Sequence, residues 1–381
     1  MIAPSNRLNS VTEYYFSKKL REIKDLENNG KPIINIAIGS PDLEPPKEIL
    51  NTLKEASLMP QANTYQSYQG LPELRESMAK FYNKNFNVSL NPNSEILPLM
   101  GSKEGVMLIS LAFLNAGDKV LIPNPGYPTY TSTTKLLHAE PVFYNLSEKN
   151  NWHPDFEALE KEDLSKVKLM WLNYPHMPTG TVATEELFTK LIAFAKKHKI
   201  LLVNDNPYSF ILNNKPMSIL HFKGAKEVAL ELNSLSKTFN MPGWRVGMLL
   251  GKEKYIKAVL QVKSNMDSGM YFAIQKSAIV ALKSADNWYT KLNAIYTKRR
   301  QLVWQILDVL NCTYNKNTSG LFVWAKVPKG TTGEALSDEL LIQKNIFVSP
   351  GFIFGSQGVN YIRVSLCASE EILKTVLKRV L

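Results

Sequence analysis

The sequence predicts an α/β protein with a mainly parallel central sheet and helices on both of its faces. First, apolar strand-like runs alternate with helical patterns between about residues 94 and 250. Second, these runs are mostly apolar, as in strands that are buried on both faces of a parallel sheet. Third, the pattern changes past about residue 282, which indicates a second, smaller α+β domain.

The elements follow from hydrophobic periodicity and from helix-end signals. Residues 12–27 have apolar side chains at helical spacing, which predicts an amphipathic helix. A short β-branched run at 33–38 predicts a strand that ends at the Gly-Ser-Pro-Asp turn. In the central region the predicted strands are 119–123, 168–173, 200–204 and 228–233, and the predicted helices are 103–115 and 184–199. Thr184 is the expected N-cap of the last helix, with acidic residues in its first turn.

The C-terminal third has a different order of elements. A long helix is predicted over 287–310, followed by shorter strands over 320–327 and 361–366. We therefore expect a large domain over residues 43–282. We expect the smaller domain to combine residues 1–42 with 283–381.

Composition and charge exclude several classes of protein. No apolar run is long enough to cross a membrane, and no secretory signal is visible. Cys312 and Cys367 lack CxxC spacing, which argues against a zinc site, so we expect no metal and a cytoplasmic location. The net charge of +11 comes from scattered lysines without a basic tract, which argues against nucleic-acid binding. Anionic small molecules remain as candidate ligands.

Lys237 is the first candidate for chemistry. It follows a predicted strand, sits among small hydroxyl residues and precedes Arg245 by eight positions. A lysine forms a Schiff base only when part of it is neutral, and burial or nearby positive charge provides that condition. Lys237 alone would be interpreted as a surface lysine in a loop. The whole string from Ser234 to Gly247 favours a reactive lysine.

This string, Ser-x-Ser-Lys-x-Phe followed by Gly-x-Arg-x-Gly, resembles the cofactor-lysine segment of class I and II aminotransferases. These are the fold-type I pyridoxal-phosphate enzymes, and the resemblance covers nearly the whole chain. It implies pyridoxal 5′-phosphate as cofactor, bound by the large domain. It implies that Lys237 holds the cofactor as a Schiff base and moves the proton between substrate Cα and cofactor C4′. Ser234 and Arg245 then bind the cofactor phosphate, a role that suits the planar guanidinium.

Other segments extend the resemblance to the rest of the cofactor. The amides of Ser102 and Lys103 start a helix, where anions bind, and match the phosphate loop of the family. Tyr127 matches the aromatic residue that stacks on the pyridine ring; by itself it is equally a turn tyrosine. Asp205 follows a strand end and matches the carboxylate that keeps the ring nitrogen protonated, although a turn-forming role fits it equally well locally. Tyr208 matches the residue that hydrogen-bonds O3′, so Lys237, Asp205 and Tyr208 form the expected catalytic set.

The resemblance also implies substrate contacts and a partner. Arg363, on a strand of the second domain, matches the arginine that pairs with the substrate α-carboxylate, and Gly39 matches the glycine that closes over it. Tyr14 resembles a substrate-gating tyrosine. Tyr65 matches a tyrosine that reaches the phosphate in the neighbouring subunit, which implies a homodimer with shared active sites. The side chain of Lys103 is a candidate contact for a distal substrate carboxylate, or it points to solvent.

One position departs from the family. In Asn173-Tyr174-Pro175-His176-Met177-Pro178-Thr179-Gly180, Met177 occupies the place of an asparagine that donates to O3′. A thioether cannot donate a hydrogen bond. We therefore expect O3′ to rely on Tyr208 or on a neighbour such as His176, and the pKa of the lysine-bound cofactor to be unusual.

The resemblance implies transfer of an amino group from an L-amino acid to a 2-oxo acid, 2-oxoglutarate being the expected acceptor. The segments near residues 101 and 125 look most like the diaminopimelate and aspartate aminotransferase branch. A carbon–sulfur β-lyase on the same fold is the alternative, since it uses the same lysine and aspartate. No G-x-G-x-x-G follows a strand, which argues against a nicotinamide dehydrogenase. We do not expect a regulatory protein either, because the chain starts directly in family sequence.

Overall fold

The computed structural model describes residues 2–284 and 287–381, and its centre is a seven-stranded sheet. The strand order is β2-β8-β7-β6-β5-β3-β4. β8 runs antiparallel to both of its neighbours, and all the other pairs are parallel. The strands are β2 (Ile96–Leu99), β3 (Lys119–Asn124), β4 (Glu140–Asn145), β5 (Val167–Leu172), β6 (Leu201–Asp205), β7 (Ala229–Ser234) and β8 (Gly247–Gly251). The predicted mainly parallel sheet is therefore confirmed.

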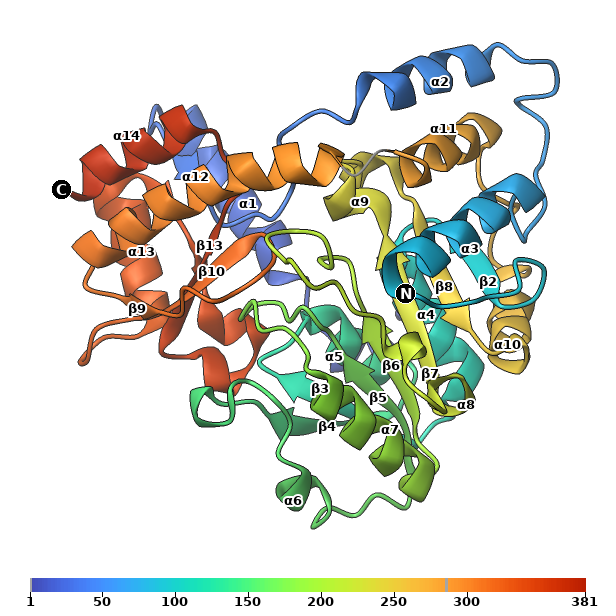
Figure 1. Ribbon diagram of the computed structural model, residues 1–381. Helices are drawn as coiled ribbons and strands as arrows, with labels where there is room; N and C mark the ends of the chain where they lie inside the picture. The colour runs from blue at the N-terminus through green and yellow to red at the C-terminus, as the bar shows by residue number, and fades with distance from the viewer. Residues whose placement is uncertain (1, 285–286) are drawn as a thin grey trace.

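Helices cover both faces of this sheet (Figure 1). Successive strand residues alternate between two hydrophobic clusters; in β5, Trp171 belongs to one and Leu172 to the other. The face with Trp171 is covered by α4 (Ser102–Phe113), α5 (Pro128–Leu136) and α10 (Glu253–Lys263). The opposite face is covered by α3 (Pro72–Phe86), α7 (Glu185–His198) and α11 (Phe272–Leu282), with α2 (Lys47–Ser57) packed on α11.

A second, smaller sheet is antiparallel and has the order β12-β13-β10-β9. Its strands are β9 (Thr313–Tyr314), β10 (Phe322–Lys326), β12 (Ser349–Pro350) and β13 (Tyr361–Ser365). It is accompanied by α12 (Asn287–Val309), α13 (Gly333–Lys344) and α14 (Glu370–Val380), at the left of Figure 1. β1 (Ile34–Asn35) pairs in parallel with β11 (Ile346–Phe347), which joins the N-terminal segment to this part of the chain.

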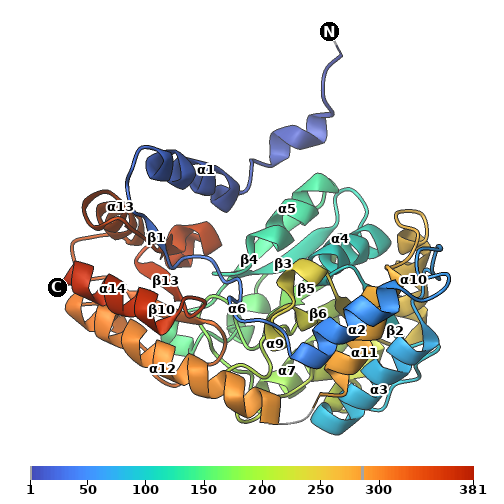
Figure 2. The ribbon, with the colours of Figure 1, turned by 90° about the horizontal axis from the view of Figure 1, so that it is seen from above.

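The remaining elements are short, apart from α1. Figure 2 shows the segment before α1 projecting away from the rest of the chain. The other helices are α1 (Tyr15–Asn28), α6 (Phe156–Leu159), α8 (Ala225–Val228) and α9 (Leu235–Thr238). The 3₁₀ turns are η1 (Asn6–Ser10), η2 (Glu148–Asn150), η3 (Ile219–His221), η4 (Pro242–Trp244), η5 (Gly351–Phe354) and η6 (Ser356–Gly358). Among the described residues, no helix combines the length and the apolar character that crossing a membrane requires.

The predicted elements match with small shifts at their ends. Thr184 caps α7, because its side chain accepts from the Leu187 N–H, as predicted. The expected strand over 33–38 is wrong in length, since only Ile34–Asn35 forms a strand. Asp205 is the last residue of β6 instead of the first residue after it. β2, β4 and β8 were not predicted; β4 is mostly exposed or half-buried and so lacks the continuous apolar signal of the inner strands.

Candidate active site

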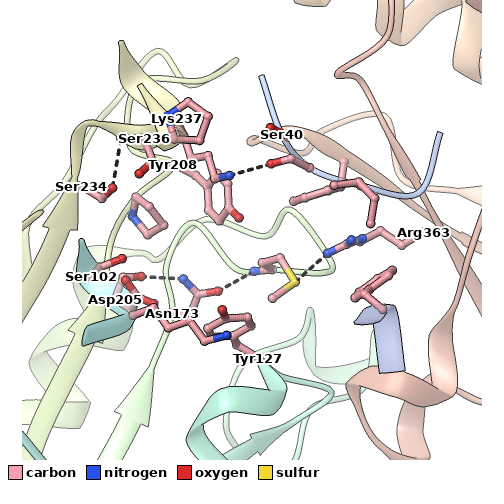
Figure 3. Close-up of a pocket in the computed structure, with 18 of the residues that line it drawn as sticks. Ser40, Ser102, Tyr127, Asn173, Asp205, Tyr208, Ser234, Ser236, Lys237 and Arg363 are labelled. Carbon is pink, nitrogen blue, oxygen red and sulfur yellow. Dashed lines mark hydrogen bonds between the residues drawn. The ribbon is translucent and has the colours of Figure 1, made fainter. Parts of the chain in front are cut away.

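A cavity of about 680 Å³ lies where the carboxyl ends of the parallel strands meet the second sheet. β6 and β7 end at it, and β13 lines its far side, as Figure 3 shows. The side of an α/β sheet where strands end is where such folds bind ligands. Of the site residues predicted from sequence, all but one line this cavity: Tyr14, Gly39, Ser102, Lys103, Tyr127, Asp205, Tyr208, Ser234, Lys237, Arg245 and Arg363.

Lys237 projects from the short helix α9 directly after β7. The Ser234 side chain caps that helix by accepting from the Ser236 N–H at 3.0 Å, which orients the turn that carries the lysine. The Nζ of Lys237 donates to the Gly39 carbonyl at 2.6 Å. Burial lowers the pKa of Lys237, and the charges of Arg363 and Arg245 act in the same direction. The lysine therefore meets the requirement for a nucleophilic amine.

Gly39 has no room for a side chain. A Cβ there would lie 2.2 Å from Cζ of Phe322, so only glycine lets the backbone pass this ring and bring its carbonyl to the lysine. Asp42, three residues further along the same segment, forms a bidentate ion pair with Arg299 of α12 at 2.6 and 2.8 Å. Lys237 thus faces a backbone segment fixed at both sides.

Asp205 is a buried carboxylate with one oxygen in use. Its Oδ2 accepts from the Tyr130 hydroxyl at 2.9 Å, while Oδ1 has no hydrogen-bond partner among the described residues. Burial raises the pKa of Asp205 to about 6, although the hydrogen bond from Tyr130 opposes the shift. The Asn173 amide donates to the backbone carbonyl of Asp205 at 2.5 Å and fixes the strand end. A buried, half-satisfied carboxylate of this kind suits a cationic N–H donor.

A cradle for an anion forms where α4 starts. A Cβ at Gly101 would lie 2.1 Å from Nη2 of Arg245, and one at Gly247 would lie 2.7 Å from the Ser102 nitrogen. The two glycines therefore let the guanidinium and β8 approach the helix start closely. The first N–H groups of a helix have no intrahelical partner and carry the positive end of its dipole. Together with Arg245, they form a site that suits a phosphate.

Hydroxyl groups complete this end of the cavity. Ser102, Ser234 and Ser236 all line it. Because Ser234 accepts a hydrogen bond from the Ser236 N–H, its own O–H remains able to donate to a ligand. Tyr127, the N-cap residue of α5, and Tyr208 add aromatic walls on either side of the cavity. These surfaces are of the size and polarity that a substituted pyridine ring requires.

Arg363 is a buried cation on β13 without an acidic partner in the described residues. Its Nη2 donates to the Ala37 carbonyl at 2.9 Å, and its Nε has no partner among the residues that the structure describes. Aromatic rings surround it: its Cζ lies 3.8 Å from the ring centre of Phe322 and 4.6 Å from that of Phe354. Burial lowers the pKa of Arg363 to about 10, so it remains charged near neutral pH. A buried charge of this kind calls for an anion within the cavity.

The Met177 side chain contacts Arg363. The guanidinium Nη1 is 3.2 Å from the methionine sulfur, a contact that Figure 3 draws as a dashed line. The structure gives no support to His176 as the replacement for the missing donor. His176 does not line the cavity, its Nδ1 is paired with Thr179, and burial lowers its pKa to about 3. Tyr208 is the remaining candidate donor to O3′.

Replacing Met177 by asparagine is expected to lower the pKa of the lysine-bound cofactor. An amide N–H at O3′ stabilises negative charge there, which favours loss of the proton that the lysine nitrogen shares with O3′. The measurement is a pH titration of the cofactor absorption band in the Met177→Asn and wild-type proteins. Met177→Leu is the matched control, because it keeps the volume without adding a donor. An Asn variant that titrates like wild type would remove the inference.

Lys103 and Tyr14 lie at the mouth of the cavity. The Lys103 ammonium sits over the Tyr14 ring, 5.0 Å from its centre, and the lysine side chain is exposed. No ion pair of Lys103 occurs in the described parts of the chain. Burial raises the pKa of Tyr14 above its usual value, so the hydroxyl stays protonated. The mouth therefore presents one available positive charge next to a phenol.

Tyr65 lies outside the cavity. It is 91% exposed on the loop between α2 and α3. This loop is held firmly from the inside. The Lys263 ammonium donates to the Tyr68 carbonyl at 3.0 Å, and Arg75 donates to the Gly70 carbonyl at 2.7 Å. A well-anchored loop with an exposed aromatic tip suits contact with another molecule.

Three residues of the site were missed from sequence. Tyr130 bonds Asp205 and stacks on Trp171, with ring centres 4.7 Å apart, but one tyrosine in a helix gives no signal of its own. Asn173 stands in the segment around Met177 and was noted only as part of that motif. Ser236 lies one residue before Lys237, and the small hydroxyl residues around the lysine were the available signal for it.

The residues present fit pyridoxal phosphate at each of its ends. Among the described residues, Asp205 has an unpaired buried oxygen that suits the ring nitrogen, and Lys237 has a lowered pKa that suits the aldehyde carbon. Close packing at Gly101 and Gly247 brings Arg245 to the helix start, where a phosphate would bind. Charge and burial at these three places thus agree with this one cofactor. The fold and this cavity define a pyridoxal-phosphate enzyme of fold type I.

Comparison with known proteins shows to which family of pyridoxal-phosphate enzymes the chain is similar. A model of the family "Aminotransferase class I and II" matches residues 31–380. The chain is 41% identical to an LL-diaminopimelate aminotransferase of Dehalococcoides mccartyi, over 97% of this chain and 96% of that protein. It is 36% identical to one of Aquifex aeolicus, over 99% of this chain and 98% of that protein. The apo structure of BacF from Bacillus subtilis superposes with a TM-score of 0.95 at 37% identity, covering 100% of this chain and 98% of that one.

The chain belongs to the class I and II aminotransferase family. It is a pyridoxal-phosphate-dependent aminotransferase. The lyase considered from the sequence receives no support from the named relatives, which are aminotransferases.

Proposed function

We propose that the enzyme transfers the amino group of a diaminopimelate-like L-amino acid to 2-oxoglutarate. The observation that carries the proposal is a pair of cations at opposite parts of one cavity, Arg363 in its interior and Lys103 at its mouth. An amino acid with a carboxylate at each end supplies one anion for each of these two cations. The named relatives at 36–41% identity, which are LL-diaminopimelate aminotransferases, support the same substrate class.

We propose these roles for the residues that meet the cofactor. When bound, pyridoxal phosphate supplies an electron-accepting ring that stabilises negative charge at the substrate Cα. Lys237 takes the proton from Cα and returns it at C4′, which its lowered pKa favours. Asp205 holds the proton on the ring nitrogen through its unpaired oxygen. Tyr208 donates to O3′, while Ser102, Ser234, Arg245 and the Lys103 amide hold the phosphate beside Tyr127.

Arg363 and Gly39 position the substrate. The buried guanidinium pairs with the α-carboxylate, since among the described residues its Nε has no partner and its Nη1 meets the Met177 sulfur, a weak acceptor. The Gly39 carbonyl accepts from Lys237, so it keeps the amine at the reacting end of the cavity. The aromatic rings around Arg363 exclude water from this ion pair and strengthen it.

Lys103→Ala is expected to raise KM for dicarboxylic amino acids about two- to fivefold, the range for an exposed ion pair. The same change leaves KM for alanine and methionine unchanged, because these substrates present no distal carboxylate. Half-reactions followed by the cofactor spectrum, with diaminopimelate, glutamate, aspartate, methionine and alanine, measure both. Lys103→Arg keeps the charge and serves as the control. If Lys103→Ala handles the dicarboxylic substrates like wild type, the distal contact is wrong.

Amino transfer and elimination are separated by their products. Adding diaminopimelate without a 2-oxo acid is expected to convert the bound cofactor to pyridoxamine phosphate in a single turnover. Release of pyruvate and ammonia from cystathionine under the same conditions would contradict the proposal.

We further propose a homodimer in which Tyr65 completes the phosphate site of a second copy. The support is a group of exposed large apolar side chains on two loops, one around Gln66 and one around Gly269. The two loops touch, because a side chain added at Gly269 would put its Cβ only 2.4 Å from the Gln66 carbonyl. These side chains are Leu58, Met59, Tyr65, Tyr68, Met266 and Tyr271. Exposed patches of this kind mark contacts between proteins.

Mixing two inactive variants tests this arrangement. A Lys237→Ala subunit keeps Tyr65, and a Tyr65→Ala subunit keeps Lys237, so each mixed dimer regains one complete site. Co-expression with different tags and purification of the mixed species is expected to restore activity to about half of wild type per dimer. Activity no higher than that of the Tyr65→Ala homodimer would show that Tyr65 does not act across subunits.

The last two parts of the proposal concern the domain boundaries and the cellular location of the enzyme. We propose that residues 43–282 bind the cofactor, and that residues 1–42 with 283–381 form the smaller part that carries Arg363. Cys312 and Cys367 are both free, which accords with a cytoplasmic location.

A further inference from the structure

Glu231 is a fully buried carboxylate in the middle of β7 that the proposed mechanism does not use. The Tyr82 hydroxyl donates to its Oε1 at 2.9 Å. The Asn204 amide and the backbone N–H of Ile219 donate to its Oε2 at 3.1 and 3.0 Å. The Asn206 amide reaches Oε1 at 3.4 Å. No cation pairs with Glu231 in the parts of the chain that the structure describes.

The orientation of the two amides favours the charged form of Glu231. The Asn204 Oδ1 accepts from the Tyr174 N–H, and the Asn206 Oδ1 accepts from the Ser209 hydroxyl. Their NH₂ groups therefore face the carboxylate, as does the N–H of Ile219. Donors of this kind stabilise the charged form of a carboxylate more than the neutral form. Burial raises the pKa of Glu231, and its hydrogen bonds act against the shift.

The partners of Glu231 flank Asp205. Asn204 precedes Asp205 and Asn206 follows it along the chain. The Glu231 carboxylate therefore accepts hydrogen bonds from both sequence neighbours of Asp205. Asn206 in turn accepts from Ser209, which follows Tyr208 directly. The position of Asp205 is therefore set by the strand end and by this buried anion together.

A second branch leads to the phosphate end of the cavity. The Tyr82 hydroxyl accepts from the Asn233 amide at 2.9 Å, and the Asn233 Oδ1 accepts from the Ser234 N–H at 2.7 Å. Tyr82 thus links Glu231 to the residue that caps α9. Two separate segments of the site depend on one carboxylate.

Glu231 also lies close enough to act electrostatically. In the β6–β7 register, Glu231 is opposite Asn204, and Leu232 is opposite Asp205. Its negative charge raises the pKa of Asp205. A second buried negative charge near the ring nitrogen favours the protonated ring.

We propose that Glu231 is a positioning residue for the cofactor, acting through Asn204, Asn206 and Tyr82. As a buried anion it fixes Asp205 and Ser234, and it strengthens the hold of the site on a protonated ring nitrogen. This inference rests on the proposed role of Asp205.

The test is Glu231→Gln, which keeps the shape and removes the charge. The readouts need no substrate: the dissociation constant of pyridoxal phosphate and the ¹⁵N shift of the bound ring nitrogen as a function of pH. The dissociation constant is expected to rise about tenfold, and the midpoint for loss of the ring proton to fall by about one pH unit. Ser277→Ala, a buried hydroxyl change within α11, is the control and leaves both values at wild type.

A folded Glu231→Gln protein with wild-type values of both quantities would overturn the proposal. A purely structural role would lower the thermal midpoint of the cofactor-free protein without moving the ring-nitrogen titration, and that result also contradicts it. If the Gln variant does not fold, Tyr82→Phe replaces it. That variant keeps the charge, so the ring midpoint stays unchanged while the dissociation constant rises several-fold; an unchanged dissociation constant overturns the proposal. Because no substrate is added, failure of the proposed amino-transfer specificity leaves these readouts unaffected.

Discussion

Replacing Lys237 by alanine is expected to lower kcat for amino transfer at least about 10⁴-fold, the full value of a positioned general base. The Lys237 amine donates to the Gly39 carbonyl, and burial lowers the pKa of this amine. No second lysine among the described residues lines the interior of the cavity. The absorption band of the lysine-bound cofactor should also disappear. Stopped-flow half-reactions and the spectrum of the loaded protein measure the two effects.

Two controls separate chemistry from loss of structure. Lys103→Ala removes the other lysine of the cavity and should retain the band, because Lys103 lies at the mouth over Tyr14. Added methylamine should restore part of the proton transfer in Lys237→Ala if the cavity is intact. Persistence of the band in Lys237→Ala would overturn the assignment of this residue.

Asp205→Asn is expected to weaken pyridoxal phosphate binding about 10²- to 10³-fold at pH 7.5, the loss for one partner of a buried ion pair. The size of the loss depends on pH. In the cofactor-free protein the pKa of Asp205 is about 6, and a protonated ring nitrogen lowers it in the complex. The contribution of this pair is therefore complete above pH 6 and is lost as the pH falls below 6.

Equilibrium titrations from pH 5 to 8 in wild type and Asp205→Asn measure this dependence. The cofactor phosphate and Lys237 titrate in both proteins, so the ratio of the two dissociation constants isolates Asp205. The ratio should shrink about tenfold per pH unit below 6. A constant ratio over this range would show that Asp205 does not carry the charge that binds the ring.

The core of the fold was predictable because its strands are buried on both faces. β5, β6 and β7 are almost entirely buried, and apolar residues predominate in β5 and β6 and alternate with polar ones in β7. The edge strand β4 is mostly accessible and lacks that signal. The strand predicted over 33–38 is shorter in the structure, where the Ala37 carbonyl accepts from the Arg363 side chain instead of from a neighbouring strand.

For the site, sequence motifs predicted which residues gather but not how they are held. Lys237, Asp205 and Arg245 stand in recognisable strings. The Tyr130 bond to Asp205 joins positions 75 residues apart, and the Tyr82 bond to Glu231 joins positions 149 residues apart. Contacts between isolated polar residues on different elements leave no local pattern in the sequence. Their partners become visible only when the sheet brings the strands together.

The aromatic enclosure of Arg363 has a consequence for protein engineering. Phe322 and Phe354 cover the faces of a guanidinium that has no carboxylate from the described chain beside it. A simple amine without a carboxyl group would leave this buried cation without an anionic partner. The resulting loss of binding free energy would not be recovered by enlarging the cavity. A redesign toward amine substrates should therefore neutralise position 363 and refill the space between the two rings before any residue at the mouth is changed.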